Sequence, residues 1–196
     1  MNKTTYRTHR LVTSAMLGAV ASILMFFNFN VPLMPSFIKM DFSELPALLA
    51  AYSYGPVAGV TVCLVKNIVN LMSSSTGGVG ELSNFMLGCM FVVPAGLVYK
   101  KFRSKKGAFA GAFLGAVSMA VFSVITNYYI VYPVYTAFMP MEVIMGMYQA
   151  ILPSVNSLWQ ALIIFNMPFT FIKGVLNLLM CMFIYKPLSP LLKGRK

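Results

Sequence analysis

The sequence predicts an all-α integral membrane protein that folds as a bundle of six helices. Hydrophobic residues make up 59% of its 196 residues and charged residues 10%, and the mean hydropathy is +0.78. The apolar runs therefore exceed what a single globular core can bury, so lipid must act as part of the solvent. The basic residues are also sorted among the loops in the pattern of a membrane topology. We expect one transmembrane domain over residues 1–196.

Four apolar runs are long enough to form single spans, because a membrane-spanning helix needs about 20 mostly apolar residues. They cover residues 11–29, 82–99, 108–133 and 158–185. A fifth apolar region, residues 42–72, is interrupted by Gly55 and Pro56, which are typical of a break between helices.

The basic residues indicate how often residues 42–72 cross the membrane, since loops rich in Lys and Arg stay in the cytoplasm. Twelve of the 15 basic residues lie before the first span, between the fourth and fifth helices, or after the last span. They are Lys3, Arg7, Arg10, Lys100, Lys101, Arg103, Lys105, Lys106, Lys186, Lys193, Arg195 and Lys196. Only two crossings of residues 42–72 place all three groups in the cytoplasm. We therefore predict short second and third helices, a tight inner turn at Gly55 and Pro56, and both termini in the cytoplasm.

The sequence lacks residues that several classes of enzyme need. His9 is the only histidine, and Cys63, Cys89 and Cys181 are spread over separate spans without metal-ligand spacing. No GxxxxGK[ST] phosphate-binding loop occurs, so we expect no ATP hydrolysis by this chain. We also expect no metal, no cofactor, no catalytic residue and no nucleic-acid partner.

Lys173 is the strongest candidate for a functional side chain. It is the only charged residue between Glu142 and Lys186, and it lies within the last apolar span. An ionisable group at that depth is costly and normally faces an interior cavity. Thr170 lies about one helical turn away and therefore on the same face.

Other polar residues are expected at a similar depth in three further helices, and we predict that they gather with Lys173 and Thr170 in a pocket that opens outward. They are Lys66 and Asn67 in the third helix, Glu81 and Asn84 at the start of the fourth, and Asn127 near the outer end of the fifth.

Several of the polar residues also fit a simpler role than ligand binding. A lysine near a span end, such as Lys66, can extend toward the interface, and Glu81 can stabilise a helix N-terminus. An asparagine within the membrane, such as Asn70, Asn166 or Asn177, can form hydrogen bonds that join helices.

Small residues form two interleaved rows on the first helix and two on the fifth, which lets helix backbones approach closely. The rows on the first helix are Ala15 and Ala19, and Ser14, Gly18 and Ser22; those on the fifth are Gly107, Gly111 and Gly115, and Ala108, Ala112 and Ala116. Each stripe fits either packing inside the bundle or docking of a separate membrane partner.

Five short runs, taken in order, resemble a known family. They are residues 39–46 (KMDFSELP), 55–59 (GPVAG), 65–67 (VKN), 80–85 (GELSNF) and 168–174 (PFTFIKG). Together they are similar to the riboflavin-binding S components of energy-coupling factor (ECF) transporters. This resemblance implies a multi-pass protein of the bacterial cell membrane that binds the vitamin from outside. It also implies partners, namely a transmembrane coupling protein and two ATP-binding subunits. In the family an Ala-xxx-Ala pattern on the first helix meets the coupling protein, and Ala15 and Ala19 match it.

The candidate residues suit the chemistry of a flavin. The carboxamide of Asn127 can both donate to and accept from the imide edge of the ring, and Lys173 and Thr170 can donate to ring atoms. The family usually has asparagine where this chain has Thr170, so one donor is missing. We assign Glu81, Asn84 and Asn67 to the ribityl hydroxyls, and Lys66 and Asp41 complete the candidate binding set.

We expect the loops at residues 30–40 and 135–156 to close over the ligand. The resemblance implies that the bundle then tips on its ATP-driven partner to deliver the ligand inward. Three other functions stay open: binding of another vitamin, such as thiamine or pantothenate; stand-alone ion-coupled transport; and membrane enzyme activity. An ion-coupled carrier would need a carboxylate deep in a span, whereas all four acids are expected near the outer face.

Overall fold

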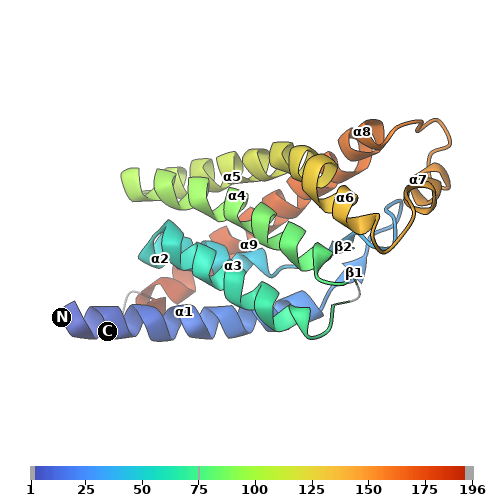
Figure 1. Cartoon of the computed structure of the whole chain (residues 1–196). Helices are drawn as coiled ribbons and strands as arrows, with labels where there is room; N and C mark the ends of the chain where they lie inside the picture. Colours follow the sequence, from blue (N-terminus) through green and yellow to red (C-terminus); the bar gives the residue numbers. More distant parts are fainter. Residues whose placement is uncertain (1–2, 75, 193–196) are drawn as a thin grey trace.

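Helices dominate the computed structural model, which describes residues 3–74 and 76–192 (Figure 1). The elements are α1 (Lys3–Phe26), β1 (Phe29–Asn30), β2 (Lys39–Met40), α2 (Glu44–Tyr54), α3 (Pro56–Leu71), α4 (Val79–Lys101), α5 (Lys105–Thr126), the π-helix η1 (Asn127–Val131), α6 (Tyr132–Tyr135), α7 (Met141–Gln149), α8 (Leu158–Ala161), the π-helix η2 (Leu162–Asn166) and α9 (Met167–Leu192).

Six helical segments form the bundle, as predicted. Four are long and apolar enough to cross a membrane: Arg7–Phe26, Val79–Lys101, Lys105–Tyr135 and Leu158–Ile184. The other two are α2 and α3, with 11 and 16 residues. At 1.5 Å per residue these two helices rise only about 16 and 24 Å. The predicted fold class, an all-α membrane bundle, is therefore confirmed.

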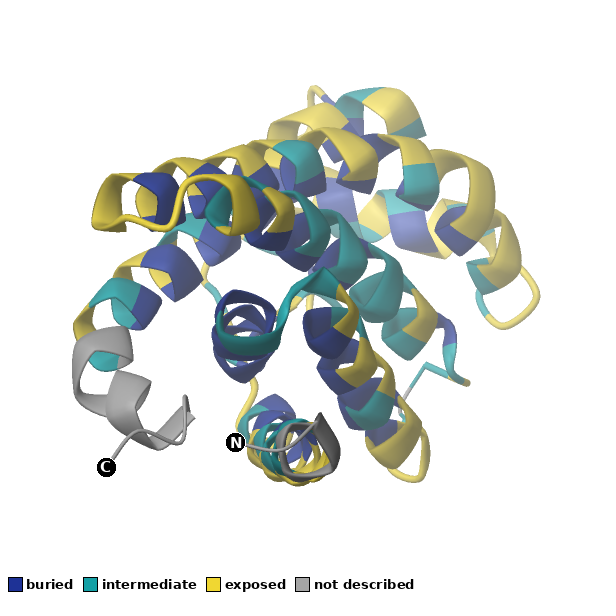
Figure 2. Ribbon diagram, turned by 90° about the vertical axis from the view of Figure 1, so that its left-hand side faces the viewer, coloured by how far each residue is buried: buried dark blue, intermediate teal, exposed yellow. Residues whose placement is uncertain are grey.

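Helix α2 is the buried helix of the bundle. Every residue from Glu44 to Tyr52 is buried, and α2 packs against α1, α3, α4 and α9. A helix enclosed in this way needs no polar face. Figure 2 shows buried residues turned toward the centre of the bundle and exposed ones around its outside. The predicted turn is present: Gly55 has a φ of 94°, which favours glycine, and Pro56 begins α3.

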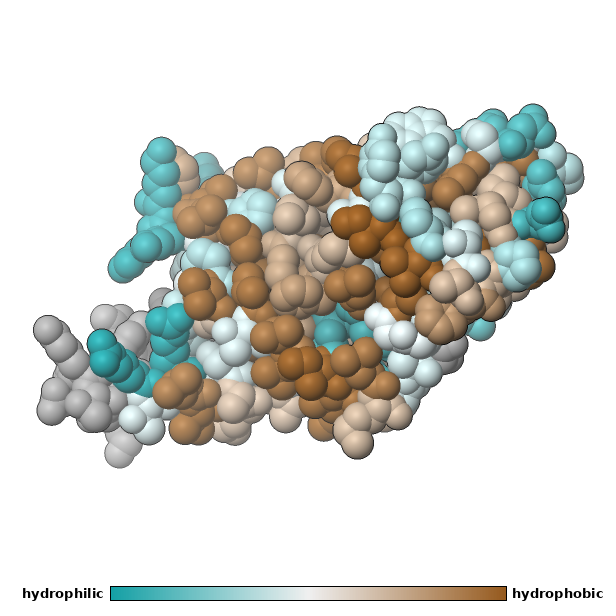
Figure 3. All heavy atoms as spheres, viewed as in Figure 1, coloured by the Kyte–Doolittle hydropathy of each residue, from teal (hydrophilic) through white to brown (hydrophobic). Residues whose placement is uncertain are grey.

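The two ends of the bundle differ in charge. Helix α1 begins, α9 ends, and the basic α4–α5 loop turns at one end, while α6, α7, α8 and the β1–β2 ribbon lie at the other (Figure 1). Figure 3 shows a broad apolar band between hydrophilic ends on the face it presents. This arrangement agrees with the predicted cytoplasmic side. Lys193, Arg195 and Lys196 of the predicted basic tail lie outside the described residues.

The two small-residue stripes prove to have different environments. On α5, all six glycines and alanines of the stripe are buried. A Cβ added at Gly115 would lie 2.4 Å from the Phe91 carbonyl oxygen of α4, so α4 and α5 pack backbone to backbone.

On α1 the two rows point in different directions. Ser14, Gly18 and Ser22 are buried, and a Cβ at Gly18 would lie 3.0 Å from the Val65 side chain of α3. Ala15 and Ala19 are exposed on the outer surface of the bundle. Only the Ala15–Ala19 row is therefore available to a separate protein.

Candidate functional site

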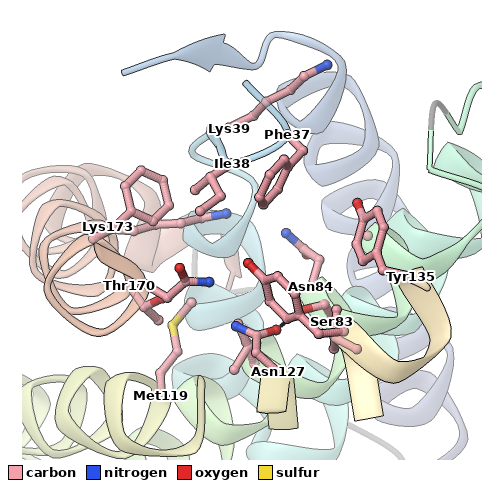
Figure 4. A pocket seen from close by; sticks show the side chains of 16 residues that line it. Phe37, Ile38, Lys39, Ser83, Asn84, Met119, Asn127, Tyr135, Thr170 and Lys173 are labelled. Atoms are coloured by element: carbon pink, nitrogen blue, oxygen red, sulfur yellow. Dashed lines mark hydrogen bonds between the residues drawn. The ribbon is translucent and has the colours of Figure 1, made fainter. Parts of the chain in front are cut away.

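A cavity near the end of the bundle opposite the basic loop brings together four of the eight predicted binding residues, Asn84, Asn127, Thr170 and Lys173 (Figure 4). It encloses about 680 Å³ of empty space, part of which is open to solvent. We call it the main cavity. Its lining residues are Phe37, Ile38, Lys39, Gly80, Ser83, Asn84, Leu87, Met119, Asn127, Val131, Tyr132, Tyr135, Asn166, Phe169, Thr170 and Lys173.

Asn127, Thr170 and Lys173 line this cavity from two different helical segments. Each is 5% exposed. The Asn127 Oδ1 accepts a hydrogen bond from the Ser83 hydroxyl at 3.2 Å, and its amide nitrogen has no partner among the described residues. The Thr170 hydroxyl likewise has no partner within residues 3–74 and 76–192. Both residues line the cavity, so these donors are available to a polar ligand.

Two π-helical turns help to place asparagines at the cavity. In η1 the Tyr132 N–H donates to the Asn127 carbonyl, and Pro133 follows; in η2 the Met167 N–H donates to the Leu162 carbonyl, and Pro168 follows. Because proline has no N–H to continue the α-helical ladder, a widened turn just before it accommodates the change. Asn127 begins the first turn and Asn166 ends the second, and both line the main cavity. Contrary to the predicted end at Pro133, the helical segment continues to Tyr135.

Lys173 is held at the cavity wall by an ion pair with Asp41. Its Nζ lies 2.8 Å from Asp41 Oδ2, and both side chains are 6% exposed. The other oxygen, Asp41 Oδ1, accepts from the Ser43 N–H at 2.9 Å and from the Ser43 hydroxyl at 2.5 Å. Burial alone would raise the pKa of Asp41, but the Lys173 and Lys66 ammonium groups outweigh it and, with the hydrogen bonds, lower the pKa to about 2. Asp41 is therefore a carboxylate at physiological pH, and Lys173 keeps two further N–H groups for a ligand.

Lys66 has a different position from the one predicted. It is fully buried, does not line the main cavity, and pairs with Glu44 at 2.6 Å. This arrangement also excludes the alternative that Lys66 extends to the membrane interface. Asn67 does not line the main cavity either; its amide nitrogen donates to the Cys63 carbonyl at 2.7 Å and to the Asn84 Oδ1 at 3.4 Å.

A second cavity adjoins the main one on the outer side, and we call it the outer cavity. The two share Phe37, Lys39, Gly80, Asn84 and Tyr135. The outer cavity also contains the predicted residues Asp41 and Glu81.

Glu81 lies in the first turn of α4, as the simpler alternative expected, and it also lines the outer cavity. Its Oε2 accepts from the Ser74 hydroxyl at 2.7 Å and from the Thr76 hydroxyl at 3.3 Å. Glu81 therefore fixes the α3–α4 loop at the rim of the outer cavity.

The aromatic part of the site was not predicted residue by residue. Phe37, from the loop between β1 and β2, packs against Tyr132, Tyr135 and Tyr148 with ring centroids 6.0–6.3 Å apart. Tyr148 of α7 is fully buried, bonds to the Tyr132 hydroxyl and donates to Asn166 Oδ1 at 2.7 Å. Parts of both predicted lid loops therefore meet over the cavity.

Trp159 is 45% exposed and packs against Tyr128, away from the main cavity lining. The cavity walls therefore combine aromatic and apolar surface with a few convergent hydrogen-bonding groups. Such a site suits a flat, uncharged ligand with polar edges.

Known proteins resemble this chain over nearly its whole length. Residues 9–185 match the family described as "ECF transporter, substrate-specific component". The chain is 34% identical to the riboflavin transporter RibU of Staphylococcus aureus (strain TCH60), over 94% of this chain and 92% of that protein. It is 32% identical to the riboflavin transporter FmnP of Bacillus subtilis (strain 168), over 97% of each. A solved structure of the S component of a bacterial ECF transporter has a TM-score of 0.75 and 34% identity, over 95% of this chain and 99% of that chain.

Proposed function

The chain belongs to the family of substrate-specific (S) components of ECF transporters, and from this membership we infer that it is the riboflavin-binding subunit of a vitamin uptake system. Its ligand is riboflavin, which it transports without chemical change, so it is not an enzyme. Relatives named as riboflavin transporters argue against thiamine, pantothenate or stand-alone ion-coupled transport. An ECF module is its partner in the membrane.

The central part of this proposal is that riboflavin binds in the main cavity. The convergence of Asn127, Thr170 and Lys173 on one cavity carries it. In our assignment, the isoalloxazine ring lies among Phe37, Tyr132 and the three polar groups. The ribityl chain then extends toward Asn84 and the Glu81 carboxylate in the outer cavity. Hydroxyl groups can donate to that carboxylate, which supports this orientation.

Removal of Lys173 tests the site. We expect detergent-purified Lys173→Met to bind riboflavin about 10–100-fold more weakly than wild type, because a hydrogen bond from a charged donor is lost. Binding is measured by quenching of riboflavin fluorescence and by the absorbance spectrum of the purified protein. The matched control is Asn177→Ala, one turn further along α9, whose side chain bonds only to the Lys173 carbonyl among the described residues. Equal affinity in Lys173→Met and wild type would remove Lys173 from the site.

The partner module, in our proposal, consists of a coupling protein and two ATP-binding subunits, and the protein lies in the cell membrane as a single multi-pass domain over residues 1–196. Capture occurs at the outer face, and ATP-driven movement of the partner delivers the ligand inward. The exposed Ala15–Ala19 row supports α1 as the docking helix.

A bulky residue on that row tests docking. We expect Ala19→Trp to bind riboflavin as wild type does but to lose uptake in cells and co-purification with the module, because the close helix approach is blocked. The control is Val121→Trp on α5, where Val121 is 43% exposed. Normal uptake with Ala19→Trp would move the docking surface elsewhere.

A further inference from the structure

A second buried ion pair lies outside both cavities and has no part in the binding scheme above. Lys66 of α3 and Glu44 of α2 are each fully buried, with Lys66 Nζ 2.6 Å from Glu44 Oε1. Taking two charges out of water is costly, and an apolar pair of similar volume would often give equal stability. Stability alone therefore gives little reason for this pair.

The surrounding residues leave space for the Glu44 carboxylate. A Cβ added at Gly88 of α4 would lie 2.9 Å from Glu44 Oε2, and Cys63 Sγ lies 3.8 Å from the same oxygen. The carboxylate is thus confined between α3 and α4, and it fixes the Lys66 ammonium in turn.

Ser43 links this pair to the cavity. The Lys66 Nζ donates to Ser43 Oγ at 2.6 Å, and Ser43 Oγ lies 2.5 Å from Asp41 Oδ1. Because an ammonium can only donate, Ser43 Oγ must accept from Lys66, and its single hydrogen is directed to Asp41. Asp41 Oδ2 then holds Lys173 Nζ at 2.8 Å. A continuous hydrogen-bonded network therefore joins Glu44 to Lys173: Lys66 donates to Glu44 and to Ser43, and Asp41 accepts from Ser43 and from Lys173.

We propose that Glu44, Lys66 and Ser43 are positioning residues for riboflavin: they fix Asp41, and through it they set the position of the Lys173 ammonium at the cavity wall. This inference rests on the proposed function. This hydrogen-bonded network contains two ammonium groups and two carboxylates. It therefore orients a donor without adding net charge at a site for an uncharged vitamin.

Removal of the Ser43 hydroxyl tests the link while both ion pairs keep their charged groups. We expect Ser43→Ala to bind riboflavin about five- to tenfold more weakly, the usual effect of one lost hydrogen bond. We also expect a displaced absorption maximum of the bound flavin at saturation, because a shifted ammonium changes the electrostatic field at the ring. The matched control is Ser123→Ala, which deletes a fully buried hydroxyl that bonds to the Ala120 carbonyl of its own helix.

The outcomes separate the two proposals. If wild type binds no riboflavin, the proposed function fails and this inference fails with it. If wild type binds and Ser43→Ala matches Ser123→Ala in affinity and spectrum, only the positioning role is overturned. Weaker binding with an unshifted spectrum also overturns it, because general loosening of the fold would have the same effect. Should Ser43→Ala not fold, the charge-conserving double variant Glu44→Gln/Lys66→Met is judged by the same two measurements.

Discussion

Lys173 is stabilised within the membrane region by a carboxylate from a distant part of the chain. Asp41 lies 132 residues earlier in the sequence, in the connection that leads into α2. The pair is only slightly exposed, so each charge depends on the other for compensation. Asp41 therefore serves the site through Lys173, in addition to lining the outer cavity.

The charge on Asp41 gives stability a defined pH dependence. Its pKa falls from 3.8 in the unfolded chain to about 2 in the folded protein. A lowered pKa stabilises the fold fully above pH 3.8, and this contribution is lost as the pH falls toward 2. We therefore expect the difference in Tm between wild type and Asp41→Asn to be constant above about pH 5 and to shrink below it.

Thermal unfolding followed by the fluorescence of Trp159 measures this difference in detergent. Glu142→Gln is the control, since Glu142 is exposed and makes no ion pair with any described residue. A difference between wild type and Asp41→Asn that grows on acidification would contradict the assigned sign.

The sequence indicated several polar residues that line the main cavity, but it did not indicate the ion pairs around them. Lys173, Thr170 and Asn127 stand out because polar side chains are rare at their depth. The partners of Lys173 and Lys66 could not be inferred, since pairing depends on how distant segments meet. Phe37 was also missed, because nothing in the sequence separates it from the other 15 phenylalanines.

At the level of helices, the small-residue pattern predicted close packing but not its direction. The α5 stripe and one α1 row face neighbouring helices, while Ala15 and Ala19 face outward. Spacing alone cannot distinguish these cases, because the inward face of a helix is set by its neighbours. The π turns were missed for a related reason, although each precedes a proline that could have indicated it.

The α4–α5 contact makes a prediction for Gly115. An added Cβ would meet the Phe91 carbonyl oxygen at 2.4 Å, so the helices would have to separate. We expect Gly115→Ala to destabilise the protein by about 1–3 kcal/mol through overpacking. Gly146→Ala in α7 is the matched control, because no atom of residues 3–74 or 76–192 lies within 4 Å of its added Cβ and alanine favours a helix. Equal Tm values for the two variants would show that α4 and α5 are less closely packed.

For the whole molecule, the positions of the basic residues and of the cavities indicate the same orientation in the membrane. The basic α4–α5 loop lies at one end of the bundle, and the cavities with the α7 region lie at the other (Figure 1). The sequence predicted this orientation, because all three groups of basic residues lie on one side of the membrane only if residues 42–72 cross it twice. It could not predict that α2 would be enclosed by four helices, which explains how so short a helix is accommodated.

Single cysteines at the two ends test this orientation. Arg103, in the α4–α5 loop, and Phe138, between α6 and α7, are both exposed, and Phe138 is 65% exposed. Because positive loops stay in the cytoplasm, we expect a membrane-impermeant maleimide to label Phe138→Cys in intact cells and Arg103→Cys only after permeabilisation. Wild type reports any labelling of the native cysteines, of which Cys63 and Cys181 are buried and Cys89 is half-buried. The reverse labelling pattern would place the cavity on the cytoplasmic side, where capture of a vitamin from outside is impossible.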